Sequence, residues 1–564
     1  MNEHVSPGNR LRAVPNSAVQ MADGTFLTQR IEAGRAAVPT LFARLEEHGV
    51  VDNFRRLGAA SSAERRGLWF TDSDLYKVME AAAWSLQSRE DPALRTQLAE
   101  ISGAVAAAQQ PDGYLNTYIT GERYQDLSWS HELYCAGHLL EAAVAHHQAT
   151  GEPVLLDVAK RLADHLCDEF GDGRREQTDG HPEIEMALTN LYRATGEERY
   201  LDLARFFLGR VDHHAMHRLT GHAVRALYYC CGLTDLVAEG DEGIRESLDR
   251  FWASLTETGS YITGGIGGRW AGESIGRSYE LPNEGAYAET CGSAAAVMWS
   301  GRMLALTGDA RYTDFGERAL LNGFLAGVSL RGDEWFYVNR LAWWGEEEVD
   351  PWALATQQFM TDMIISARRK PWYDVTCCPS NAVRLLASLP SRMYGASDDG
   401  VWVHLYAAST LRSRTPAGQP LKLTQHTDYP WDLSTGIELE LEEPEEFSLH
   451  VRIPEWSSWS MAVYVNGKET GDITPGAYLE IRRTWTSGDE VSVELDARPI
   501  FVEADPRLTE NRGSVAITRG PLVYCLEGVD NPGVDVFGAT VDPSEGLMWS
   551  HRKDLLGGVT VVSG

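Results

Sequence analysis

Apolar residues recur with the period of an α-helix through residues 78–395 of this chain. In one stretch, five of them stand at i, i+3, i+4, i+7 and i+8 and so share one helix face: Ile184, Ala187, Leu188, Leu191 and Tyr192. Similar runs begin near Val78, Cys135, Val224, Cys291 and Val383. Together with their partner helices, these runs predict about five or six helical hairpins.

Short Thr-Gly-acid segments separate the two helices of the predicted hairpins. They are Thr150-Gly151-Glu152, Thr195-Gly196-Glu197 and Thr307-Gly308-Asp309, with a looser fourth at Glu239-Gly240-Asp241. The glycine suits the left-handed position after a helix, and the acid suits the start of the next one. Because the segments lie 45, 44 and 68 residues apart, which is too irregular for an open solenoid, we expect the hairpins to close into an α/α toroid.

The apolar period changes to two after Tyr394. Three segments alternate between apolar and polar residues and are typical of half-buried strands: Ile437–Leu441, Leu449–Ile453 and Val491–Leu495. Asn466-Gly467 is a hairpin-turn signal. These features predict an antiparallel β-sandwich.

A second β unit is expected from Arg498, with strands at Gly513–Ile517 and Leu522–Tyr524. It is small for a separate sandwich, so either the N-terminal segment adds strands to a β domain or the chain is cut short. The chain therefore divides into an N-terminal segment (1–25), a helical domain (26–398), a β-sandwich (399–497) and the second β unit (498–564).

Composition narrows the function classes. The 564 residues are 43% hydrophobic and 23% charged, as in globular proteins. With 50 Lys and Arg against 81 Asp and Glu, the net charge of -31 argues against a nucleic-acid or anionic-membrane partner. No apolar run approaches the ~18 residues of a membrane span, and the N-terminus has no signal-peptide pattern. We expect a soluble, cytoplasmic protein.

Eight cysteines are too few for a disulfide scaffold in a chain of this length. Glu289 and Cys291 are two positions apart, and Cys377 and Cys378 are adjacent. One carboxylate and three thiols are the ligand inventory of a tetrahedral zinc site, although buried, inert thiols are the alternative. The other cysteines have no ligand-like spacing and are assigned to the core: Cys135, Cys167, Cys230, Cys231 and Cys525.

Several long motifs resemble glycoside hydrolase family 127, the β-L-arabinofuranosidases. They are, in order, HELYCAGHLLEAAVAHH, GGIGG, GESIG, LPNEGAYAETCGS, FYVN and RRKPWYDVTCCPSN. The resemblance runs from about Phe54 to Tyr394 and resumes at RIPEW and RGPLVYCLE. It implies a mainly α protein in which an (α/α)6 barrel is followed by β-sandwich domains, in agreement with the hairpin count.

The resemblance also implies the active-site residues. Zinc would be held by Glu289, Cys291, Cys377 and Cys378, with Cys377 also the nucleophile and Glu273 of the GES motif the acid/base. Zinc ligation keeps a thiol as its thiolate, which suits a retaining mechanism through a glycosyl-thioether. A proton donor needs a raised pKa, and an anionic cluster nearby is expected to raise that of Glu273.

Five further residues match the sugar-binding region of the family: His131, His181, His222, Tyr337 and Glu317. A histidine at a helix start is alternatively a cap or a core residue, and Glu317 lies in an amphipathic helix where a structural salt bridge is the alternative. Asp72 and Asp74 precede a helix, which favours a capping or barrel-closing role over catalysis.

The loop Leu341–Phe359 departs from the family pattern, because it is longer, more acidic and richer in Trp. It either reshapes the sugar subsite or serves a contact in a homo-oligomer.

The sequence thus favours a zinc-dependent retaining exo-glycosidase that releases terminal L-arabinofuranose from a small β-linked carbohydrate. The alternatives are the same machinery on another pectic sugar, a carbohydrate-binding protein with structural zinc, and a lyase or epimerase on a similar toroid.

Overall fold

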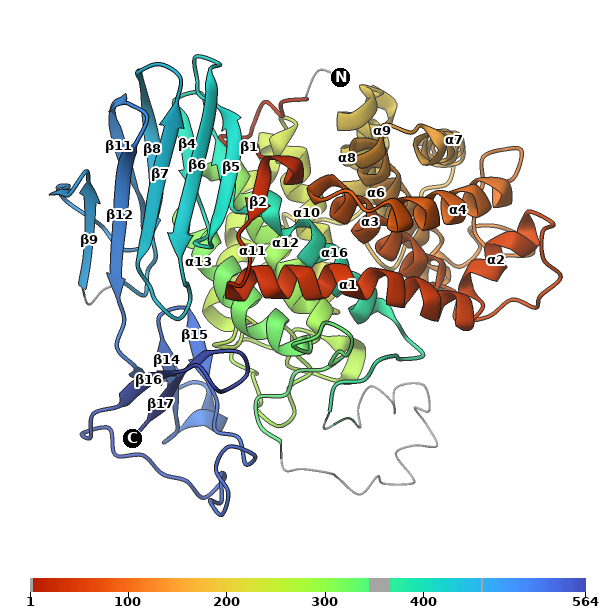
Figure 1. Ribbon diagram of the computed structural model, residues 1–564. Coiled ribbons are helices and arrows are strands. Elements are labelled where there is room, and N and C mark those ends of the chain that lie inside the picture. The colour runs from red at the N-terminus through yellow and green to blue at the C-terminus, as the bar shows by residue number, and fades with distance from the viewer. Residues whose placement is uncertain (1–3, 344–365, 367, 458–459) are drawn as a thin grey trace.

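Helices form the first two thirds of the chain and β-sheets the last third (Figure 1). The computed structural model describes residues 4–343, 366, 368–457 and 460–564. None of the described helices combines the length and the apolar character that crossing a membrane requires.

Six helices of the described chain pack side by side in a closed order. Each contacts the next one, and the last returns to the first. They are α3 (Asp72–Ser88), α6 (Glu132–Thr150), α8 (Ile184–Thr195), α10 (Ala223–Ala238), α12 (Thr290–Thr307) and α16 (Cys377–Ser388). This is the cycle of contacts that the expected (α/α)6 barrel requires.

An outer helix packs against each member of this ring. The outer helices are α1 (Phe26–Glu47), α4 (Pro92–Ala108), α7 (Val154–Glu169), α9 (Glu198–Leu208), α11 (Arg245–Thr258) and α13 (Ala310–Arg318). Two shorter α-helices, α2 (Val50–Leu57) and α5 (Leu127–Ser130), also belong to the described part of this region. Gly151, Gly196 and Gly308 end three of the inner helices with φ of 75°, 76° and 70°. The predicted left-handed helix ends are therefore confirmed.

Two larger sheets consist mainly of strands that follow the helices. One has the order β1-β3-β4-β8-β11 and the other β10-β9-β12-β7-β6-β5-β2. Their strands are β1 (Arg12–Ala13), β2 (Val19–Met21), β3 (Tyr394–Ala396), β4 (Gly400–Val403), β5 (Ser409–Arg414), β6 (Pro420–Thr427), β7 (Thr435–Leu441), β8 (Glu445–Ile453), β9 (Ser460–Val465), β10 (Lys468–Glu469), β11 (Ala477–Trp485) and β12 (Asp489–Asp496). The three alternating segments lie within β7, β8 and β12, and Asn466-Gly467 joins β9 to β10, as predicted.

The N-terminal segment joins the larger sheets and not the C-terminal unit. β1 pairs with β3, and β2 pairs with β5, both antiparallel. The C-terminal unit contains two small sheets, built from β13 (Ile500–Glu503), β14 (Val515–Arg519) and β15 (Leu522–Tyr524), and from β16 (Met548–Arg552) and β17 (Val559–Ser563).

A buried ion-pair cluster joins the helical region to the five-stranded sheet. Arg452 of β8 is fully buried, and its guanidinium lies 2.6 Å from Asp314 Oδ1 and 2.5 Å from Glu317 Oε1, both in α13. The Tyr429 hydroxyl donates to the same Glu317 oxygen at 2.7 Å. Burial raises the pKa of Asp314 to about 6, even though Arg452 opposes the shift. The Arg452 guanidinium thus stabilises the ionised forms of two carboxylates that burial alone would disfavour.

We expect Arg452→Met to lower the free energy of unfolding by about 3–5 kcal/mol, because two buried carboxylates would lose their cation. Urea unfolding followed by tryptophan fluorescence measures the change. Arg482→Met is the matched control, since it breaks an exposed pair with Glu446 and should leave the midpoint unchanged. Equal midpoints for the two variants would contradict the expectation.

Candidate active site

The N-termini of two neighbouring inner helices bring the predicted metal ligands together. Glu289 is the N-cap of α12 and Cys291 lies in its first turn, while Cys377 and Cys378 are the first two residues of α16. Helices α12 and α16 pack against each other in the ring. Helix N-termini carry partial positive charge, which favours thiolates and carboxylates.

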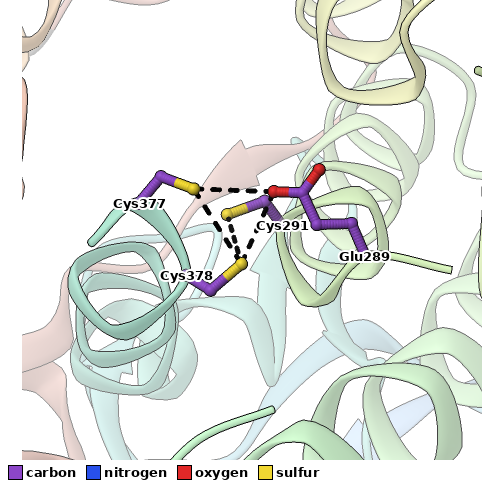
Figure 2. Close-up of side chains that lie close together, drawn as sticks. All are labelled: Glu289, Cys291, Cys377 and Cys378. Atoms are coloured by element: carbon purple, nitrogen blue, oxygen red, sulfur yellow. Dashed lines mark hydrogen bonds between the residues drawn. The ribbon is translucent and has the colours of Figure 1, made fainter. Parts of the chain in front are cut away.

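The four side chains converge on one point (Figure 2). Their ligand atoms all lie within 4.8 Å of one another. Cys378 Sγ is 3.4 Å from Cys291 Sγ and 4.0 Å from Cys377 Sγ. Glu289 Oε1 is 3.4 Å from Cys378 Sγ and 3.6 Å from Cys377 Sγ.

These separations fit a zinc ion. With Zn–S near 2.3 Å and Zn–O near 2.1 Å, a tetrahedral site separates two sulfurs by about 3.8 Å and a sulfur from an oxygen by about 3.6 Å. In addition, Glu289 Oε2 is buried and has no hydrogen-bond partner among the described residues. The donor set and its spacing are therefore those of a Cys3Glu metal site.

Without a cation, the carboxyl of Glu289 and the three thiols cannot all be ionised at the same time. Burial raises the pKa of Glu289 and of Cys378 well above their usual values, and a hydrogen bond to Cys291 is the main cause of the raised pKa of Cys377. Burial also acts to raise the pKa of Cys291, but hydrogen bonds from the two other thiols lower it to about 6. Four neighbouring anions need a compensating cation, and a bound divalent ion provides one.

Tyr337 completes the surroundings of Cys377. Its hydroxyl oxygen lies 3.2 Å from Cys377 Sγ, and the side chain is buried. The Tyr337 carbonyl accepts a backbone hydrogen bond from Thr290 at 3.0 Å, so the FYVN segment is fixed to the start of α12. The sequence-predicted tyrosine therefore contacts the sequence-predicted nucleophile.

Glu273 forms a close pair with His222. Glu273 Oε2 lies 2.8 Å from His222 Nε2, and the carboxyls of Glu273 and Glu289 and the ring of His222 lie within 4.8 Å of one another. A backbone hydrogen bond of 2.9 Å from Ile275 to Gly221 ties the two loops together. Glu273 has φ of 52°, a strained conformation for a residue with a side chain and one that is frequent at active sites.

The pKa of Glu273 is lowered, which is the reverse of the direction expected from the sequence. Burial acts to raise it, but the hydrogen bond and the charge of His222 outweigh the burial. The sequence does not show this contact, because His222 and Glu273 come from different loops.

His131, His181 and His222 form a row of rings. The ring centres of His131 and His181 are 5.8 Å apart, and those of His181 and His222 are 5.5 Å apart. Nδ1 of His131 lies 2.7 Å from the Trp129 carbonyl, and Nδ1 of His181 lies 3.0 Å from the Pro182 carbonyl. Burial lowers the pKa of both rings, that of His131 to about 4. Nδ1 of His131 also lies 3.2 Å from the donating Trp69 Nε1. The neutral His181 ring carries its proton on Nδ1, which makes its Nε2 an acceptor for a hydroxyl group.

Comparison with known proteins identifies the family. The model of the GH127 β-L-arabinofuranosidase catalytic domain matches residues 18–391. This chain belongs to glycoside hydrolase family 127. The GH127 middle domain matches residues 400–497, and the GH127 C-terminal domain matches residues 499–555.

Relatives of this GH127 chain are similar over nearly its whole length. A non-reducing end β-L-arabinofuranosidase of Bifidobacterium longum is 35% identical, over 91% of this chain and 84% of the relative. The crystal structure of a GH127 β-L-arabinofuranosidase from Geobacillus stearothermophilus T6 is 36% identical with a TM-score of 0.89, over 96% of this chain and 92% of that one. A second solved GH127 β-arabinofuranosidase is 34% identical with a TM-score of 0.91, over 98% and 91% of the two chains.

Besides the pKa of Glu273, two expectations for the GH127 chain require correction. Glu317 does not join the cluster, because Arg452 and Tyr429 hold its carboxylate at the contact between α13 and the sheet. The structural salt bridge is therefore its observed role. Cys525 is exposed and not in the core, since it follows the end of β15 at Tyr524. Residues 344–359 of the departing loop Leu341–Phe359 lie outside the described residues.

Lys77 is a site residue that the sequence analysis missed. This buried lysine lies 3.5 Å from Asp74 Oδ1, and the same oxygen accepts a hydrogen bond from Ser380 of α16 at 3.3 Å. Burial acts to lower the pKa of Lys77, but the charges of Asp74 and Cys377 raise it. Asp74 thus links α3 to α16, a barrel-closing role. The sequence did contain a signal for Lys77: it is a lysine among the apolar positions of a helix, and a lysine is rarely buried without a charged partner.

Proposed function

We propose that this chain is a zinc-dependent, retaining exo-β-L-arabinofuranosidase that acts on terminal arabinofuranosyl groups of small glycans or glycoconjugates. The observation that carries the proposal is the Cys3Glu cluster beside the Glu273–His222 pair. The names of the relatives from Bifidobacterium and Geobacillus support the sugar and the linkage.

The cluster itself suggests which thiol reacts. Cys291 and Cys378 are buried, whereas Cys377 retains partial exposure and contacts the Tyr337 hydroxyl. Zinc, when bound by Glu289 and the three cysteines, keeps these thiols as thiolates at neutral pH. Cys377 Sγ attacks the anomeric carbon, so a C–S bond forms as the glycosidic C–O bond breaks, and Glu273 gives its proton to the departing oxygen.

The second half of the reaction releases the sugar. Glu273, now a carboxylate, takes a proton from water, and the oxygen of that water attacks the anomeric carbon as the C–S bond breaks. Two inversions at one carbon retain its configuration. His222 positions the Glu273 carboxyl, since its Nε2 lies 2.8 Å from Glu273 Oε2. The Nε2 atom of His181 accepts a hydrogen bond from a sugar hydroxyl, and the neighbouring His131 ring lines the same sugar pocket.

We expect Cys377→Ser to abolish hydrolysis of an aryl β-L-arabinofuranoside, because the weakly acidic hydroxyl cannot replace a thiolate.

Glu273→Gln should lower kcat by about 10²–10⁴-fold on a substrate with a poor leaving group. The decrease should be smaller on a dinitrophenyl substrate, whose leaving group departs without a proton. Steady-state kinetics measure both effects. Glu284→Gln, an exposed change in a neighbouring loop, is the control. Wild-type activity in Cys377→Ser would refute the mechanism.

Zinc content provides an independent test. The purified Cys378→Ser variant should contain one equivalent of zinc less than the wild-type protein, because the site loses a thiolate ligand. Cys231→Ser, which changes a buried thiol outside the cluster, should retain as much as wild type. Metal analysis of freshly purified protein checks this. A chelator should remove activity and added zinc restore it; an active, metal-free enzyme would contradict the proposal.

A further inference from the structure

A second group of metal-binding side chains lies on the five-stranded sheet. His450 of β8 stands directly opposite Glu480 of β11, and Asp399 lies in the turn between β3 and β4. The ligand atoms of the three residues lie within 4.8 Å of one another, and His450 Nε2 is 3.5 Å from Asp399 Oδ2. None of these residues belongs to the Cys3Glu cluster.

His450 is a buried polar group that lacks a hydrogen-bond partner at the nitrogen facing these carboxylates. It is 3% exposed, and its Nε2 makes no hydrogen bond within the described part of the chain. The ring stacks on Trp402 with 3.9 Å between ring centres and 12° between planes, which fixes its orientation. Buried nitrogens are nearly always paired, so an unpaired one indicates a missing ligand.

Two serines orient the carboxylates. Ser397 Oγ donates to Asp399 Oδ1 and itself accepts a hydrogen bond from Trp402 Nε1 at 2.7 Å. Ser448 Oγ donates to Glu480 Oε1 at 2.6 Å. Such bonds around the ligands are a regular feature of metal sites, because they set the direction of each ligand atom.

We infer that Asp399, His450 and Glu480 bind a divalent transition-metal ion such as zinc, whose usual ligands include histidine nitrogen and carboxylate oxygen. One imidazole nitrogen and two carboxylate oxygens at about 2.0–2.2 Å from zinc lie about 3.4 Å apart in tetrahedral geometry. The observed 3.5 Å between His450 Nε2 and Asp399 Oδ2 matches this spacing. Two carboxylates balance the charge of the ion, and the fourth position is left for water.

The ion would connect β8, β11 and the β3–β4 turn. These strands stand together in the sheet at the left of Figure 1. The same region contacts α13, since the Tyr478 hydroxyl lies 3.1 Å from Thr313 Oγ1. The bound ion therefore stabilises the sheet where it meets the helices, and its binding energy adds to folding stability.

Cobalt titration of the full-length protein tests this site. The protein is used with zinc in its cysteine cluster, and Co²⁺ is the probe. We expect one further equivalent to bind without the near-ultraviolet thiolate-to-cobalt band, and to raise the Tm. Asp399→Asn and Glu480→Gln should each weaken this binding at least ~10-fold, and Ser448→Ala about 10-fold, all with unchanged hydrolytic activity.

His426→Ala is the matched control, because His426 and Glu438 form an exposed histidine–carboxylate pair, 3.8 Å apart, without a third metal-ligating group among the described residues. It should leave the titration unchanged. The inference is overturned if wild type binds no further equivalent, if that equivalent shows the thiolate band, or if the Asp399→Asn/Glu480→Gln double variant binds it as tightly as wild type. These outcomes do not depend on the proposed hydrolysis.

Discussion

Concentrated negative charge in a buried space is the constraint around which the site is built. Three thiols and a carboxyl, with ligand atoms within 4.8 Å of one another, cannot all ionise unless a cation joins them. The surrounding residues meet this constraint in part: two helix N-termini face the cluster, and the buried Lys77 interacts electrostatically with Cys377. A bound zinc ion would supply the remaining positive charge.

Ring closure makes this arrangement possible. The first and last inner helices, α3 and α16, pack together, and Asp74 of α3 joins them by accepting a hydrogen bond from Ser380 of α16. The same closure places α16 beside α12, so the adjacent cysteines meet Glu289 and Cys291. The proposed nucleophile therefore owes its position to a contact between helices that are distant in the sequence.

Between the helical ring and the sheet, buried charged residues hold two structural units together. Arg452 satisfies two carboxylates of α13 and attaches the sheet to the helical ring. On the same sheet, the proposed site of Asp399, His450 and Glu480 contains oxygen and nitrogen donors only. Three thiolates and a carboxylate make a complete set of four protein ligands, whereas one imidazole and two carboxylates leave the fourth position of a tetrahedral ion to water.

Much of the architecture was predictable from the sequence because it follows from local patterns. The period of 3.6 at Ile184–Tyr192, the glycines that end helices and the alternation at Val491–Leu495 each correspond to an observed element. The motifs around Glu289 and Cys377 indicated the family and the ligand set. These signals depend on residues close together in the chain, where backbone geometry fixes the relation between side chains.

The tertiary structure alone decided how distant residues act on one another. Glu317 contacts Arg452 and not the cluster, and His222 reverses the expected pKa shift of Glu273. His450 faces Asp399 and Glu480 only because three strands come together in one sheet. Electrostatic energy depends on the distance in space between charges and on their burial. Neither quantity is encoded in any one stretch of sequence.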